Sequence, residues 1–98
     1  MKAKIWNFQA WVSETDSKKL YTYLENLLQL SGFKIVGFVD KHFEPQGYSG
    51  TWLISESHLA VHTFPERNKT YVELSSCNGE KQKKFVELFN LKKVQPDD

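Results

Sequence analysis

The sequence predicts an α+β fold, a two-layer α/β sandwich in which a mainly antiparallel sheet carries two helices on one face. Along the chain, apolar residues recur either every second residue, as in strands, or about every 3.6 residues, as in helices. These patterns predict the order strand, helix, four strands, helix. The chain has 98 residues, which is enough for one hydrophobic core but not for two. We therefore expect a single domain over residues 1–98.

The first strand and the first helix have the clearest patterns. In residues 5–12 apolar side chains occupy the even positions, as in a half-buried strand. Residues 13–16 (Ser-Glu-Thr-Asp) offer candidates for a helix N-cap, and Gly32 suits the left-handed position after a helix. Leucines spaced along one helix face lie between them, at Leu20, Leu24, Leu27 and Leu28.

Sheet dominates the middle of the chain. Further strands are predicted, from their β-branched and aromatic residues, at 33–43, 51–55, 58–64 and 70–76. The loop at 44–47 and the turn at 65–69 contain the proline and glycine residues that favour such breaks. Asn78 is the expected N-cap of a second helix with the apolar stripe Phe85, Leu88 and Phe89, and residues 96–98 form a polar tail.

Composition excludes several classes of protein. The net charge of +1, from 13 basic and 12 acidic residues, provides no strong field for nucleic acid or an anionic membrane. No segment resembles a signal peptide or a membrane span. Cys77 is the one cysteine, so no internal disulfide can form, and a cytoplasmic protein is the simplest expectation. Because one sheet face lacks helices, we expect a second copy to cover it, giving an αββα homodimer about a two-fold axis.

Nucleophilic and ionisable side chains cluster between residues 49 and 77. On one strand, His58 and His62 share a face but stand about 13 Å apart, too far to bind one metal ion, so no metal site is expected. Ser57 lies between Glu56 and His58, yet the G-x-S-x-G motif of hydrolases is absent. On these grounds alone both histidines could be ordinary strand residues, and Cys77 a small buried apolar one.

A longer motif distinguishes these readings. Residues 47–66 contain Glu56-Ser57-His58, with His62 five residues after the serine and Cys77 fifteen residues after His62. This pattern closely resembles the self-processing segment of the prokaryotic S-adenosylmethionine decarboxylase proenzymes. A weaker resemblance extends from the first strand to about residue 79.

The resemblance implies that the chain cleaves itself. The hydroxyl of Ser57 would attack the carbonyl of Glu56, which separates residues 1–56 from 57–98 and leaves Ser57 as a covalent pyruvoyl cofactor that binds the substrate amine as a Schiff base. His62 would be the proton acceptor, because a serine hydroxyl is a weak nucleophile without a base. Alternation puts Ser57 and His62 on opposite faces of one strand, so we expect Ser57 in the turn or in a distorted strand end.

The resemblance also assigns the substrate and the remaining site residues. The substrate would be S-adenosylmethionine, and the decarboxylated product would donate an aminopropyl group for spermidine biosynthesis. Cys77 would protonate the product carbon, and Ser49 would assist processing. Glu66 would bind the ribose hydroxyls, Phe43 would stack on adenine, and the pocket would draw on both subunits of a dimer.

Some residues depart from the family pattern. Ile5-Trp6-Asn7-Phe8 takes the place of an opening Gly-x-His motif, and Ser75-Ser76-Cys77-Asn78-Gly79 takes that of Phe-Thr-Cys-Gly. Arg67 follows Glu66 where an aromatic residue is usual. Two alternatives therefore remain: a pyruvoyl-dependent decarboxylase of another amino acid, such as arginine or ornithine, and an unprocessed relative without enzymatic activity.

Overall fold

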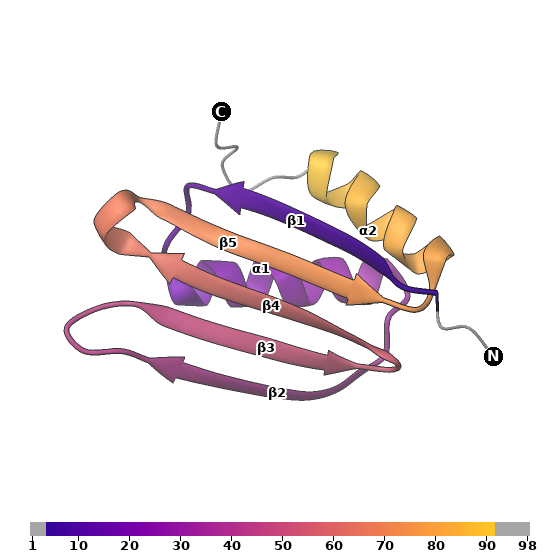
Figure 1. Cartoon of the computed structure of the whole chain (residues 1–98), viewed down its shortest axis with the longest axis horizontal. Helices are drawn as coiled ribbons and strands as arrows, with labels where there is room; N and C mark the ends of the chain where they lie inside the picture. The colour runs from indigo at the N-terminus through magenta and orange to yellow at the C-terminus, as the bar shows by residue number, and fades with distance from the viewer. Residues whose placement is uncertain (1–3, 92–98) are drawn as a thin grey trace.

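The computed structural model describes residues 4–91, which form one five-stranded sheet and two α-helices (Figure 1). The elements are, in chain order, β1 (Trp6–Val12), α1 (Ser17–Leu30), β2 (Ile35–His42), β3 (Tyr48–Ile54), β4 (Ser57–Phe64), the short 3-10 helix η1 (Pro65–Arg67), β5 (Lys69–Ser76) and α2 (Gly79–Leu91). The predicted element order and the α+β class are confirmed.

The strands lie in the order β1-β5-β4-β3-β2, and every neighbouring pair is antiparallel. Strands β2 to β5 form a meander, while β1 returns to pair with β5. The two edge strands, β1 and β2, are thus joined by α1, which crosses the sheet between them (Figure 1). This topology places the β3–β4 turn and the end of β5 side by side.

The first helix begins and ends where its sequence signals predict. Asp16 is the N-cap, and its side chain accepts a hydrogen bond of 2.9 Å from the backbone N–H of Lys19. After the C-cap Ser31, Gly32 has a φ of +90°, a conformation that glycine adopts without a Cβ penalty.

Both helices pack on one face of the sheet, which lies in front of them in Figure 1. The four leucines of α1 are buried against inward-facing side chains of the central strands, among them Trp52 and Leu59. From α2, Phe85 and Phe89 are buried and meet Phe8 edge to face. Within residues 4–91 the opposite face carries no helix, and we call it the open face.

The start of β3 and the burial of one residue of α2 differ most from the sequence prediction. Strand β3 begins at Tyr48 rather than at residue 51, because Ser49 and Gly50 pair with His62 and Val61 of β4. Cross-strand partners thus extend a strand through residues of weak β propensity. In α2, Leu88 belongs to the predicted buried stripe but is only partly buried. The predicted tail at 96–98 lies outside the described residues. Neither helix within residues 4–91 is long and apolar enough to cross a membrane.

Candidate active site

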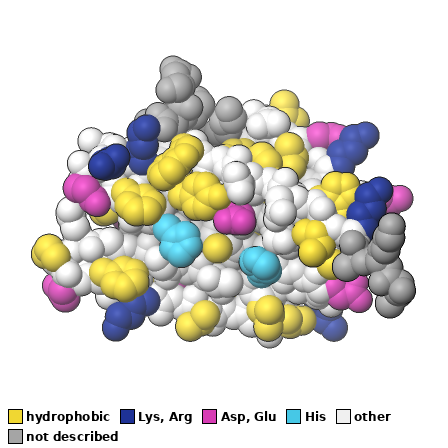
Figure 2. Space-filling model, viewed as in Figure 1, with side chains coloured by type: hydrophobic (Ala, Val, Ile, Leu, Met, Phe, Trp, Pro, Cys, Tyr) yellow, Lys and Arg dark blue, Asp and Glu magenta, His cyan; other side chains and the backbone are white. Residues whose placement is uncertain are grey.

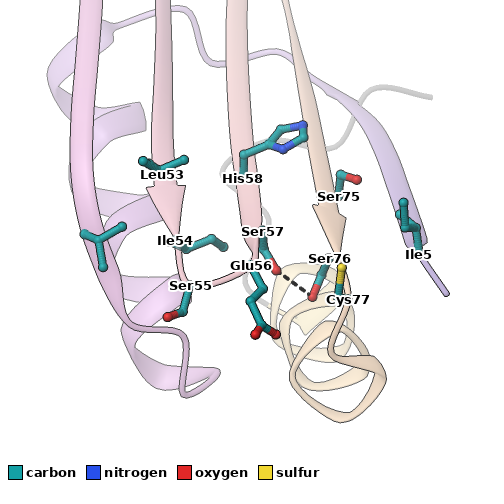
Figure 3. A pocket seen from close by; sticks show the side chains of 11 residues that line it. Ile5, Leu53, Ile54, Ser55, Glu56, Ser57, His58, Ser75, Ser76 and Cys77 are labelled. Carbon is teal, nitrogen blue, oxygen red and sulfur yellow. Dashed lines mark hydrogen bonds between the residues drawn. The ribbon is translucent and has the colours of Figure 1, made fainter. Parts of the chain in front are cut away.

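A pocket of about 500 Å³ lies at the β3–β4 turn and the end of β5, and we call it the hairpin pocket (Figure 3). Glu56, Ser57 and Cys77, all predicted site residues, line it together with His58 and Ser76. The antiparallel pairing explains this arrangement, since Ser57 at the start of β4 is the Cα partner of Ser76 at the end of β5. One chain therefore brings the predicted cleavage bond and the predicted proton donor into the same pocket.

The backbone is strained at the bond that the sequence marks for cleavage. Glu56 is exposed in the two-residue turn and has a φ of +60°, a left-handed conformation that costs a residue with a Cβ about 1–2 kcal/mol. Ser57 follows as the first residue of β4 and is buried on the helix-covered side. Its hydroxyl donates a hydrogen bond of 3.1 Å to the hydroxyl of Ser76. A strained, exposed peptide bond thus precedes a fixed serine hydroxyl.

The thiol of Cys77 is free and exposed, unlike that of a small core residue. Cys77 directly follows β5 and stands two residues before the start of α2. Asn78 caps this helix through its side-chain oxygen, which accepts a 3.0 Å hydrogen bond from the N–H of Lys81, as predicted. The cap fixes the short connection on which the thiol lies.

A second pocket, of about 300 Å³, lies at the opposite end of β4, and we call it the histidine pocket. It collects the other predicted residues, namely Phe43, Ser49, His62 and Glu66. Ser49 and His62 are Cα partners on β3 and β4, and the Ser49 hydroxyl lies 2.7 Å from His62 Nδ1. Glu66 and Phe43 are exposed at the rim, on η1 and after β2 respectively.

Two tyrosines beside the histidine pocket are held in the protonated form. Burial, reinforced by the hydrogen bond of 2.7 Å that its hydroxyl donates to Asp40, raises the pKa of Tyr48. Partial burial and the carboxylate of Glu73 raise the pKa of Tyr71, the Cα partner of His62 on β5. Both phenols remain neutral hydrogen-bonding groups near neutral pH, so they do not compete with the imidazole as bases.

The two pockets are too far apart to act together within one chain. Five residues of extended strand separate Ser57 from His62, which corresponds to about 16 Å. The side chains also differ in face, because Ser57 points to the helix side while His62 is partly exposed on the open face. Among residues 4–91, no three His, Cys, Asp or Glu side chains gather as a metal site would require. One chain thus presents two separate groups of predicted residues.

Sequence reasoning missed Ser76 as a member of the site. The alternation in the predicted strand at 70–76 puts the even residues on the buried face, together with Val72 and Leu74. A serine in such a row, at a strand end, could have been singled out as a buried hydroxyl that needs a partner.

Comparison with known proteins bears directly on this geometry. The family model for S-adenosylmethionine decarboxylase matches residues 7–96, which is nearly the whole chain. The chain belongs to the S-adenosylmethionine decarboxylase family. The resemblance inferred from the motif around Ser57 is thereby confirmed at the level of the family.

Two similar relatives carry the name S-adenosylmethionine decarboxylase proenzyme. The S-adenosylmethionine decarboxylase proenzyme of Syntrophomonas wolfei is 42% identical over 62 residues, covering 63% of this chain and 49% of its own. That of Archaeoglobus fulgidus is 35% identical over 75 residues, covering 76% of this chain and 66% of its own. The chain thus spans about half to two thirds of the length of these relatives.

A solved structure supports the fold of this family member. The adenosylmethionine decarboxylase from Aquifex aeolicus superimposes with a TM-score of 0.71, over 89% of this chain and 78% of that one. The two sequences are 20% identical, so the likeness shows that the two proteins share the α+β sandwich fold.

Proposed function

We propose that this chain is a pyruvoyl-dependent S-adenosylmethionine decarboxylase that cleaves its own backbone between Glu56 and Ser57. The observation that carries the proposal is the strained turn, in which Glu56 at φ +60° precedes a serine whose hydroxyl is already hydrogen-bonded. Membership of a family whose relatives are named proenzymes supports it, because that name implies processing of a precursor.

The fold supports cleavage without loss of structure. Residues 1–56 contain β1, α1, β2 and β3, while residues 57–98 contain β4, β5 and α2. The two strands of the second fragment lie between strands of the first, since β1 pairs with β5 and β3 pairs with β4. Two ladders of hydrogen bonds and the shared core would therefore hold the fragments together after the turn is cut.

The hairpin pocket suits a pyruvoyl group at position 57. That group would supply an electron sink for the loss of carbon dioxide, in place of pyridoxal phosphate. Ser57 starts a strand that stays clamped between β3 and β5, so the reactive end would be fixed in the pocket. The thiol of Cys77 borders the same pocket and is exposed, which fits a donor of the proton that replaces the lost carboxylate.

We propose further that two copies complete the site. A two-fold axis between two open faces, perpendicular to the strands, would set the hairpin pocket of one copy against the histidine pocket of the other. This arrangement removes the separation of about 16 Å between Ser57 and His62 that one chain imposes. His62, with Ser49 hydrogen-bonded to its Nδ1, would then accept a proton from the partner's Ser57 around the exposed turn at Glu56, because the Ser57 hydroxyl itself faces the helix side.

The open face has the side chains that a second copy would bury. Figure 2 shows this face with hydrophobic groups around the histidines. Trp11 packs against Phe64 and Tyr71 on this side, with ring centroids 5.8 and 5.3 Å apart, yet Trp11 remains 46% exposed. Leu53 and Val39 are more exposed still. Covering these groups would stabilise a dimer by about 25 cal/mol for each Å² of apolar surface buried.

The rim of the histidine pocket fits the nucleoside part of the substrate. Glu66 is an exposed carboxylate that can accept hydrogen bonds from two ribose hydroxyls. Phe43 is 48% exposed and offers an aromatic face for adenine. The product would be decarboxylated S-adenosylmethionine, the aminopropyl donor of spermidine biosynthesis in the cytoplasm.

Release of labelled carbon dioxide tests the proposal. The purified protein should release it from carboxyl-labelled S-adenosylmethionine, while the Ser57→Ala variant should release none. Arginine and ornithine labelled in the same way are the matched controls. Release from one of them, and not from S-adenosylmethionine, would refute the proposed substrate, and release from none would point to a protein without this activity.

A further inference from the structure

Ser76 lies beside the proposed nucleophile, Ser57, with its side chain buried. It is the last residue of β5, is only 1% exposed, and is the Cα partner of Ser57 across the β4–β5 ladder. The two hydroxyl oxygens are 3.1 Å apart, the hydrogen bond drawn as a dashed line in Figure 3. A buried hydroxyl in contact with a nucleophile can act on the reaction through it.

The hydrogen bonds of Ser76 determine where the proton of Ser57 points. A serine hydroxyl has one proton to donate and two lone pairs that accept. Ser76 Oγ donates to the carbonyl oxygen of Asn78 at 3.3 Å and accepts from the N–H of Asn78 at 2.9 Å. Its remaining lone pair receives the proton of Ser57. The proton of Ser57 therefore points towards Ser76, and the lone pairs of Ser57 Oγ are left free to attack the carbonyl carbon of Glu56.

This chain of hydrogen bonds also anchors Ser57 to a helix. Asn78 is the N-cap of α2, because its side chain accepts from Lys81 and its carbonyl accepts from the N–H of Gln82 at 3.0 Å. The orientation of the Ser57 hydroxyl is therefore set by a folded element, whereas the turn on its other side, at Glu56, is exposed.

We propose that Ser76 is a positioning residue for self-cleavage; this inference rests on the proposed function. In the first step of self-cleavage, Ser57 Oγ bonds to the carbonyl carbon of Glu56, the peptide C–N bond breaks, and the hydroxyl proton, accepted by the partner's His62, ends on the released nitrogen of Ser57. The resulting ester then loses the Cα proton of residue 57 and eliminates the Glu56 carboxylate, which separates the two fragments. Water converts the dehydroalanine left at position 57 to the pyruvoyl end and ammonia. Ser76 forms no bond to the reacting carbon. It limits the hydroxyl of Ser57 to one orientation before the attack, which removes rotational freedom that would otherwise slow the step.

The time course of cleavage during cell-free synthesis of the full chain tests this role. Ser76→Ala should slow cleavage about 5- to 10-fold, the effect of losing one net hydrogen bond. Ser76→Thr, which restores the hydroxyl, should return the rate to within about 3-fold of the wild type. Ser17→Ala is the matched control, because Ser17 is a serine at the start of α1 that lines neither the hairpin pocket nor the histidine pocket, and this variant should cleave at the wild-type rate.

The outcomes separate this inference from the proposed function. If the wild type cleaves and Ser76→Ala keeps pace with it, the positioning role is wrong while self-cleavage stands. If Ser76→Thr is as slow as Ser76→Ala, the hydroxyl is not the cause, and the role is equally wrong. A wild type that never cleaves overturns both proposals. Circular dichroism checks folding, and if Ser76→Ala does not fold, Ser76→Cys takes its place in the same comparison.

Discussion

The separation of the two pockets predicts complementation between two inactive variants. Cys77→Ala damages only the hairpin pocket, and Glu66→Ala damages only the histidine pocket. If each active site combines the hairpin pocket of one copy with the histidine pocket of the other, a mixed dimer has one doubly damaged site and one intact site. Each variant alone should be nearly inactive, whereas their mixed dimer should be active.

The size of the recovery follows from counting sites. When both variants are produced in one cell in equal amounts, about half of the dimers are mixed, and one of the two sites in each is intact. The activity should therefore reach about one quarter of the wild type. The assay is release of carbon dioxide from carboxyl-labelled S-adenosylmethionine by this unfractionated mixture. Mixed dimers isolated through two different affinity tags, one on each variant, should reach about one half of the wild-type activity. Activity no higher than the mean of the two parents would refute a site shared between copies.

Three further predictions concern the fold. Trp52→Ala should lower the free energy of unfolding by about 3–5 kcal/mol, measured by urea titration, because this fully buried ring also donates a 3.1 Å hydrogen bond to Glu25. Burial raises the pKa of Tyr23 from 10.0 to about 12, so the unfolded state loses its proton first as the pH rises. The contribution of the Tyr23 phenol to the free energy of unfolding is fully present below pH 10 and is lost as the pH rises towards 12. Between pH 10 and 12 the free energy of unfolding should therefore fall less in Tyr23→Phe than in the wild type. Gly79→Ala should destabilise by about 1–3 kcal/mol, since its Cβ would lie 2.8 Å from the Trp6 ring, and Trp6→Leu should relieve most of that cost in the double variant.

Local patterns in the sequence predicted much of the fold. Alternation over residues 5–12 predicted β1, and the leucine spacing with Asp16 and Gly32 predicted α1, because each signal depends on neighbours a few residues away. The start of β3 was predicted too late, because Ser49 and Gly50 are in a strand only through their pairing with β4. Such pairing depends on residues distant in sequence.

The site was predicted residue by residue but not in its spatial arrangement. Motif spacing indicated Ser57, His62 and Cys77, and alternation already put Ser57 and His62 on opposite faces. The sequence did not reveal that Cys77 shares a pocket with Ser57 while His62 shares one with Ser49, since strand register determines both groupings. The hydrogen bond from Ser57 to Ser76 depends on the same register.

Self-cleavage between Glu56 and Ser57 is the central claim, and the intact mass of the purified protein tests it most directly. Self-cleavage predicts two fragments, residues 1–56 and residues 57–98, with the second fragment lighter than its sequence by the loss of ammonia that turns serine into a pyruvoyl end. Ser57→Ala should remain one full-length chain. A wild-type protein that keeps its full-length mass after prolonged incubation would contradict self-cleavage.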